Sequence, residues 1–382
     1  MIDRRKLLQT TATLGAVGLF APGMAFAQAT STAKRLFVIV QRGAADGLGM
    51  IAPVGDPDFA RLRGPWVEDY ADARKLGSFF ALHPALARVG SMYGAGEATF
   101  VHATATSYRK RSHFDGQNLL ETGGMRAYEH KDGWLNRLLS LLPQDGFRAL
   151  ALAPTVPMAL RGTNNVTSYA PSSLPDASGQ LMDRIAMLYA GDEQLHALWE
   201  NAQATREMAG DNGLRNLRNA EATGELAASL MRDDDGARLM MFDSPGWDSH
   251  ANQRGQLSRN LTQLDTMLGA YREGMGAKWK DTMVLVVTEF GRTVAVNGTN
   301  GTDHGTASAA MVLGGSVKGG RVVADWPGLR SQDLYEGRDL MPTTSLEAVL
   351  ASSVAQHFAL DPARALATLF PGRALNHISG LA

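Results

Sequence analysis

Short apolar runs alternate with longer amphipathic stretches along the chain. Each run is five or six residues long and rich in Val, Leu, Ile, Met or Ala, a pattern typical of buried strands in a parallel sheet. The runs lie at 36–40, 98–102, 147–152, 238–242, 283–287 and 309–313, and a shorter candidate lies at 322–323. Strands that alternate with helices predict an α/β fold, in which a mainly parallel sheet is covered by helices on both faces.

Helical spacing fills the intervals between the apolar runs. The expected helices lie at 83–92, starting with His83-Pro84, then at 112–121, at 134–142, after residue 250 with leucines on one face, and at 345–357. From about 157 to 233 the sequence changes to polar, Ala-rich helices interrupted by Asn, Ser and Pro. This change predicts an inserted helical cap that belongs to the same domain.

The first 27 residues have the features of an export signal. Residues 4–6 are basic, residues 7–20 are apolar and rich in small side chains, and Ala25-Phe26-Ala27 forms a cleavage site. The adjacent arginines resemble a twin-arginine signal, and an ordinary secretory signal is the alternative. The sequence therefore predicts a periplasmic or secreted protein in which residues 28–382 form one α/β domain.

Composition excludes several classes of function. The chain contains no cysteine, which excludes disulfides, thiolate metal sites and a cysteine nucleophile. A formal net charge of -1 and the absence of a basic run after the signal argue against a nucleic-acid partner. No later segment has the apolar length to span a bilayer, so no membrane association is expected after signal removal. An anionic small molecule remains a possible substrate, and no protein partner is indicated.

Polar residues that could carry chemistry gather just after apolar strands. They form three groups: Arg42 with Asp46; Asp243, Asp248 and His250; and Glu289 and Arg292 with Asp303 and His304. In an open α/β sheet, ligands bind beyond the carboxyl ends of the strands. Carboxylates and imidazoles at such an edge suit one divalent metal ion, either zinc, manganese, magnesium or calcium. The stretch 281–315 is expected to supply much of the active centre.

Each of these residues also has a structural alternative. Asp46-Gly47 can be a turn, and Glu289 can pair with Arg292 three positions later. Ser112 can be a helix N-cap, with Asp115 completing a capping box. In the catalytic interpretation, His113 beside Ser112 faces the site as a general acid or base.

Seven motifs in order resemble one family of exported proteins. They are the RR-containing signal, QRGAADG, RSHFDGQNLLETG, DGWLNR, GWDSHANQ, TEFGRT and GTDHG. Together they resemble the domain-of-unknown-function 1501 family over nearly the whole mature chain. That family is distantly similar to the alkaline phosphatase and sulfatase superfamily, which implies an α/β sheet with a metal centre at the strand ends.

The superfamily resemblance departs from its usual pattern at several positions. Glu289 and Phe290 stand where the superfamily has Asp and His, and His113 stands at the nucleophile position. Covalent catalysis through a hydroxyl is therefore not expected. His304 resembles the later metal-binding histidine, and Asp243 or Asp248 with His250 resembles the middle pair.

Two functions follow from this comparison. In the first, the protein is a metal-dependent hydrolase of phosphate or sulfate esters. Its metal ligands are Asp248, His250, Asp303 and His304, its catalytic residues are His113, Ser112 and Glu289, and its substrate-binding residues are Arg42 and Arg292. In the second, it is a non-catalytic periplasmic binding or assembly protein that keeps the scaffold.

Overall fold

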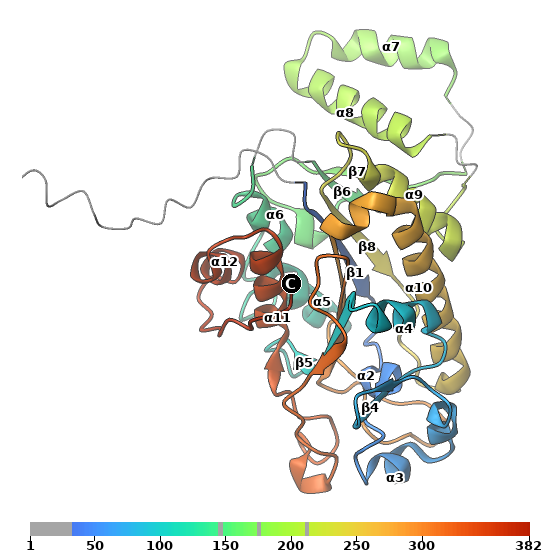
Figure 1. Cartoon of the computed structure of the whole chain (residues 1–382). Helices are drawn as coiled ribbons and strands as arrows, with labels where there is room; N and C mark the ends of the chain where they lie inside the picture. Colours follow the sequence, from blue (N-terminus) through green and yellow to red (C-terminus); the bar gives the residue numbers. More distant parts are fainter. Residues whose placement is uncertain (1–32, 144–147, 174–176, 211–213) are drawn as a thin grey trace, which may run out of the picture.

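A nine-stranded sheet forms the centre of the molecule (Figure 1). The computed structural model describes residues 33–143, 148–173, 177–210 and 214–382, so the predicted signal at 1–27 lies outside the described residues. Within these ranges the strand order is β11-β5-β10-β9-β1-β8-β6-β7, and β12 pairs with β5. The strands are β1 (Arg35–Gln41), β5 (Ala98–Ala105), β6 (Ala149–Leu152), β7 (Thr167–Tyr169), β8 (Leu239–Ser244), β9 (Thr282–Val287), β10 (Ser308–Leu313), β11 (Arg321–Val323) and β12 (Thr344–Ser345).

Every strand pair is parallel except the two that β10 makes with β5 and β9. The predicted α/β class with a mainly parallel sheet is therefore confirmed. Residues 288–307 between β9 and β10 contain no helix, and a parallel connection normally needs a helical crossover. The chain instead turns back directly, so the start of β10 lies at the edge where β9 ends. This reversal places residues on both sides of the 288–307 loop at one edge of the sheet.

Helices cover both faces of the sheet (Figure 1). Side chains alternate between faces along a strand, so Phe37 and Ile39 of β1 pack with α4, α9 and α10, whereas Leu36 and Val38 pack with α6, α11 and α12. The helices are α2 (Gly47–Met50), α3 (Phe59–Arg63), α4 (Ala87–Gly94), α5 (His113–Thr122), α6 (Trp134–Leu139), α7 (Gly179–Tyr189), α8 (Glu193–Ala209), α9 (Ala220–Arg232), α10 (Gln253–Met275), α11 (Leu346–His357) and α12 (Pro362–Leu369), with 3-10 helices η1 (Gly64–Tyr70), η2 (Met158–Leu160), η3 (Gly276–Asp281) and η4 (Ser331–Asp333). None of the helices in the described ranges combines the length and apolar character needed to cross a bilayer.

The segment between β1 and β5 builds a small subdomain at the carboxyl end of β1. It contains α2, α3, η1 and a three-stranded sheet of β2 (Ile51–Ala52), β4 (Phe80–Leu82) and β3 (Lys75–Leu76). The expected helix start at His83-Pro84 is wrong, because α4 begins at Ala87. Nδ1 of His83 instead accepts a hydrogen bond from the Ala85 N–H, which closes a turn before the helix.

The stretch 157–233, predicted as a helical insertion, is divided between the core and a projection. Its strand β7 extends the main sheet beside β6, and its helix α9 packs along α10 in the core. Helices α7 and α8 project at the opposite end of the molecule from α2 and α3 (Figure 1). Residues of α8 share a cavity with Arg148 and Ala237, which precede the amino ends of β6 and β8. These two helices therefore lie away from the carboxyl edge of the sheet.

Candidate metal centre

Residues far apart in the sequence meet at the carboxyl edge of the sheet. His113 is the first residue of α5, Asp248 and His250 lie in the loop after β8, Glu289 follows β9, and His304 precedes β10. The carboxyl end of β8 and the reversal between β9 and β10 both lead to this edge. The fold therefore brings together the two acid-and-histidine motifs that the sequence identified.

Three imidazoles and one carboxylate converge at the centre of this group. Nε2 of His304 lies 2.9 Å from Nε2 of His113, 3.1 Å from Nε2 of His250 and 3.0 Å from Oδ1 of Asp248. Asp248 also lies 2.9 Å from Nε2 of His250 and 3.3 Å from Nε2 of His113. Ligand atoms of a tetrahedral zinc site, with bonds of about 2.0–2.1 Å, are separated by about 3.3 Å. The cluster thus has the dimensions of a metal-binding site.

The other ring nitrogen of each histidine is held by an oxygen acceptor. Nδ1 of His113 contacts Oε1 of Glu289 at 2.8 Å, Nδ1 of His250 contacts Oδ1 of Asp303 at 3.1 Å, and Nδ1 of His304 contacts the carbonyl oxygen of Arg111 at 3.0 Å. An acceptor at Nδ1 fixes the proton on that nitrogen and leaves the lone pair on Nε2. Histidines that bind metals are oriented in this way.

These lone pairs fit a divalent cation. Within the described residues, ligand atoms of His113, Asp248 and His304 lie within 4.8 Å of one another, which makes these three the candidate ligands. His250 contacts Asp248 and His304 from the more exposed side. Three facing lone pairs beside a carboxylate contain no donor among them, so the arrangement needs a proton or a metal ion to be stable.

The charges of the cluster follow from the same contacts. Burial acts to raise the pKa of Asp248, but hydrogen bonds from Arg292 and His304 outweigh it and lower that pKa to about 2. The hydrogen bond to Glu289 raises the pKa of His113, and burial lowers the pKa of His304. Without a bound cation, a proton therefore resides on His113 and is shared with His304. A metal ion would replace this proton.

Glu289 is a buried anchor for His113. Its Oε1 accepts hydrogen bonds from the backbone N–H groups of Gly43 and Ala44 at 2.9 and 3.2 Å, and its Oε2 accepts from Thr288. Burial acts to raise the pKa of Glu289, but these bonds and the one from His113 lower it below its usual value. The carboxylate is therefore charged and its position is fixed, which fits a positioning residue.

The backbone that surrounds Glu289 is tightly constrained. Gly43 has φ of 116°, and a Cβ atom there would lie 2.4 Å from the backbone nitrogen of Asp248. Ala44 and Arg111, at φ of 60° and 59°, are held in the left-handed region although neither is glycine. Backbone strain of this kind is found where the surrounding structure requires it, commonly at functional sites.

Arg292 fixes Asp248 from beneath the cluster. Its fully buried guanidinium donates to Oδ1 of Asp248 at 2.9 Å and to the carbonyl of Ser249 at 2.8 Å, and it also contacts Thr302. Glu289 contacts His113 instead, so the alternative that Glu289 and Arg292 pair with each other is wrong. Since Arg292 is committed to protein groups, the geometry gives it a positioning role, and its contact with substrate remains a prediction.

Arg42 lies in a separate ion-pair group. Its guanidinium donates to both carboxylate oxygens of Asp243 at 3.0 and 3.1 Å, and it forms an ion pair with Glu121 at 2.8 Å. Of the two aspartates that the sequence left open, Asp248 therefore faces the histidines and Asp243 faces Arg42. Binding of an anion by Arg42 would require it to leave these partners.

Ser112 and Asp46 have structural roles. Ser112 is the N-cap residue of α5, but its side chain makes no capping hydrogen bond, and Asp115 contacts the hydroxyl of Tyr108 instead. The predicted capping box is therefore wrong. Asp46 caps α2 through the N–H of Gly49 and forms a buried ion pair with Arg63. Among the described contacts, none joins the Ser112 hydroxyl to the cluster.

Sequence reasoning missed three residues that support the centre. The carbonyl of Arg111 holds His304, and the side chains of Gln253 and Thr302 link Arg292 to Asp46 through buried hydrogen bonds. A backbone carbonyl carries no side-chain signal. Gln253 belongs to the GWDSHANQ motif and Thr302 to GTDHG, so their motif positions were the available signal.

Comparisons with solved structures relate the chain to several enzymes. The C-terminal periplasmic domain of EcEptC from Escherichia coli, solved in complex with Zn, has 9% identity and a TM-score of 0.38, over 75% of this chain and 74% of that one. The phosphonate monoester hydrolase of Agrobacterium radiobacter has 11% identity and a TM-score of 0.35, over 86% and 84%. The alkaline phosphatase from the Antarctic bacterium TAB5 has 9% identity and a TM-score of 0.38, over 76% and 94%.

A comparison with curated proteins gives no match. The family model described as "Protein of unknown function (DUF1501)" matches residues 33–370. This match agrees with the family that the sequence motifs indicated. Because it spans nearly all of the described chain, the protein belongs to the DUF1501 family.

Proposed function

We propose that this protein is a metal-dependent hydrolase of phosphate or sulfate esters. The observation that carries the proposal is the convergence of three histidine Nε2 atoms on Asp248, with each Nδ1 held by an oxygen acceptor. His113, Asp248 and His304 would hold one divalent ion. Imidazole ligands favour zinc over magnesium and calcium, which prefer oxygen ligands. When bound, such an ion polarises an ester oxygen or lowers the pKa of a water molecule.

His250 and Asp303 would supply proton transfer beside the ion. His250 is half exposed, and Asp303 at its Nδ1 would orient the ring and stabilise its charged form. Nε2 of His250 would accept a proton from an attacking water and later return it to the leaving alcohol. This assignment exchanges the roles that the sequence suggested, since His113 becomes a ligand and His250 the base. A hydroxyl nucleophile is not required.

Metal content and hydrolysis test the proposal together. Purified protein should contain about one equivalent of zinc by elemental analysis, and it should cleave an aryl phosphate or aryl sulfate in a chelator-sensitive reaction. His304→Ala and Asp248→Asn should lose both properties. Asp243→Asn is the matched control, because Asp243 leads into the same loop but faces Arg42. Protein without zinc or any other divalent metal, even after incubation with these salts, would refute the proposal.

A non-catalytic role in binding or assembly is the second candidate. It is favoured by the two predicted substrate arginines, since both Arg42 and Arg292 are neutralised by carboxylates. In that case the ion would stabilise the loops at the carboxyl edge. Stoichiometric metal with no cleavage of either ester class, together with a partner that co-purifies in stable amounts, would favour this second function.

We also propose that the protein is exported by the twin-arginine pathway. The support is the basic, apolar and A-x-A pattern within residues 1–27. Replacing Arg4 and Arg5 by lysine should leave the uncleaved protein inside the cell. Cell fractionation and N-terminal sequencing measure this outcome, and a mature periplasmic product from the variant would exclude the twin-arginine route.

A further inference from the structure

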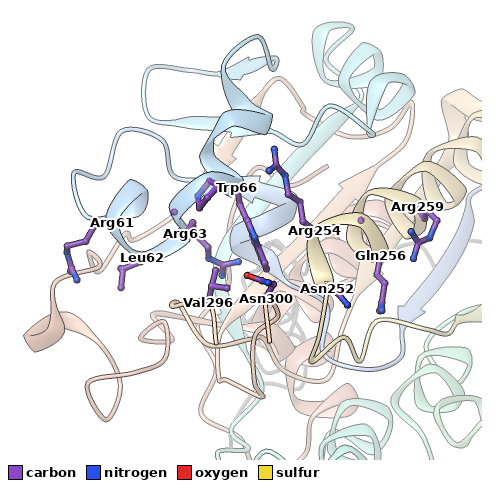
Figure 2. Close-up of a pocket in the computed structure, with 13 residues that line it drawn as sticks. Arg61, Leu62, Arg63, Trp66, Asn252, Arg254, Gln256, Arg259, Val296 and Asn300 are labelled. Atoms are coloured by element: carbon purple, nitrogen blue, oxygen red, sulfur yellow. The ribbon is translucent and has the colours of Figure 1, made fainter. Parts of the chain in front are cut away.

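A second cavity lies beside the metal centre and is lined by arginines (Figure 2). Its volume is about 890 Å³, and its walls come from α3, the start of η1, the first turns of α10 and the loop that contains Val296 and Asn300. Its 13 lining residues include Arg61, Arg63, Arg254 and Arg259, and none of the 13 is acidic. A cavity of this size is suited to a ligand far larger than a single inorganic anion.

The carboxylates that balance these arginines lie outside the lining. Arg254 forms an ion pair with Asp69 at 2.7 Å, and Arg61 forms one with Asp58 at 2.7 Å. Arg259 is exposed and forms no ion pair or hydrogen bond within the described residues. An anion that enters the cavity therefore meets donors without meeting a carboxylate in the wall.

Arg63 and the arrangement of the other arginines add further features. The side chain of Arg63 is buried against Asp46, and its Nε has no hydrogen-bond partner among the described residues. Figure 2 shows Arg63 near the middle of the cavity, with Arg61 and Arg259 toward opposite ends of the view. The positive groups are thus spread along the cavity. Guanidinium groups bind sulfate and phosphate oxygens bidentately.

The cavity and the metal centre share a wall. The N–H groups of Asn252 and Gln253 donate to the carbonyls of Thr299 and Asn300 at 3.0 and 2.8 Å. His250, two residues before Asn252, belongs to the metal centre, whereas Asn252 and Asn300 line the cavity. A chain of buried hydrogen bonds also leads from Arg63 through Asp46, Gln253, Thr302 and Arg292 to Asp248.

We propose that this arginine-lined cavity binds an extended polyanion that carries several sulfate or phosphate groups. The ligand would be the part of the ester substrate that lies beyond the reacting group, so its link to hydrolysis rests on the function proposed above. The anion binding itself does not depend on the metal. Trp66 is buried, with the Arg63 guanidinium 5.6 Å from its ring centroid, so no open aromatic face is offered for stacking of a nucleobase.

Binding measurements with short dextran sulfate and with polyphosphate test the proposal. Isothermal titration calorimetry at low ionic strength should detect at least one of these chains, and the affinity should fall as salt is added. The chain that binds more tightly identifies sulfate or phosphate as the preferred group. Uncharged dextran should not bind, and inorganic sulfate should bind at least tenfold more weakly than the chain.

The variant Arg254→Gln/Arg259→Gln should lower the affinity for the bound chain by about tenfold or more. The matched control is Arg272→Gln/Lys278→Gln, which also removes two positive charges. Arg254 and Arg272 both lie on α10, both pair with a carboxylate and both have side chains 40% exposed. The control should change affinity less than twofold. Equal losses in the two variants, or no binding of either chain to the wild type, would overturn the proposal.

A metal-centre variant separates this proposal from the proposed function. His304→Ala should lose metal and hydrolysis yet keep the wild-type affinity for the polyanion. If the protein binds no metal and cleaves no ester, the calorimetry still decides whether the cavity binds polyanions. Conversely, normal metal content without polyanion binding would refute the cavity site alone.

Discussion

At the scale of single residues, the centre depends on how each imidazole is held. His113, His250 and His304 point Nε2 inward because a carboxylate or a carbonyl occupies Nδ1. Of these anchors, Glu289 is fully buried while Asp303 is exposed. A buried charge exerts a stronger field than an exposed one, because water screens it less. Glu289 should therefore be the more important anchor.

Replacing Glu289 by glutamine tests this role. The substitution keeps the shape and the oxygen that accepts from His113, Gly43 and Ala44, but it removes the negative charge. Zinc affinity, measured by competition with a chelating dye, should fall by about 10- to 100-fold, the usual loss when a group behind a ligand is altered.

Asp303→Asn is the control for Glu289→Gln. It changes the exposed anchor of His250, which lies outside the three-residue ligand group. Zinc affinity should change little in this variant, whereas ester hydrolysis should fall if His250 is the base. Equal zinc affinities for Glu289→Gln and the wild type would show that Glu289 does not support the site.

At the scale of elements, the loop between β9 and β10 and the start of α10 form one rigid unit. The hydroxyl of Thr302 donates to Oε1 of Gln253 at 2.6 Å and accepts from Nε of Arg292 at 3.2 Å. Gln253 in turn donates to Asp46 at 2.7 Å. All four side chains are buried, so each polar group in the network needs its partner.

The substitution Thr302→Val should break this unit while keeping its volume. It leaves Oε1 of Gln253 without its donor, at a cost of about 1–3 kcal/mol in the free energy of unfolding. Denaturant titration measures this loss. The control is Thr262→Val on the exposed face of α10, where the hydroxyl contacts only the helix carbonyl of Ser258, and it should change stability by less than about 0.5 kcal/mol. A similar small change in both variants would contradict the proposed rigidity.

The elements also separate what periodicity can predict from what it cannot. The apolar runs predicted the main strands, because burial on both faces requires continuous apolar residues. The start of α4 was placed too early, since the turn closed by His83 Nδ1 is a local contact without periodicity. The reversed direction of β10 was also not predictable, because apolar runs look alike in both directions.

At the scale of the whole molecule, two buried histidines should make stability depend on pH. His102 and His357 are buried, and burial lowers their pKa values to about 4 and about 3. Nε2 of His102 contacts the carbonyl of Ile51, and Nε2 of His357 contacts the carbonyl of Arg35. Both side chains are therefore neutral in the folded protein at neutral pH.

Stability should fall as the pH decreases from about 6.5 to about 4. In this window the unfolded histidines bind protons and the folded ones do not, so protonation favours unfolding. For His102 the loss should be on the order of 3 kcal/mol by pH 4. His102→Gln should flatten this pH dependence in denaturant titrations, whereas His377→Gln removes an exposed histidine and should not. An unchanged slope in His102→Gln would contradict the assignment.

The sequence by itself determined the α/β class, the family and the residues from which the centre is built. Apolar runs and short motifs depend on local order, and they are readable without contacts. His113, Asp248 and His304 were all identified in this way. Their roles were less accessible, because a histidine that binds metal and one that transfers protons look the same in sequence.

Only the tertiary structure decided which groups face each other. It separated Asp248 from Asp243, moved Asp303 from the ligand set to a position behind His250, and paired Arg42 and Arg292 with carboxylates. It also created the arginine-lined cavity from segments almost 200 residues apart, Arg61 to Trp66 and Asn252 to Arg259. These outcomes depend on the packing of loops at the carboxyl edge, where the direction of each side chain is set by distant partners.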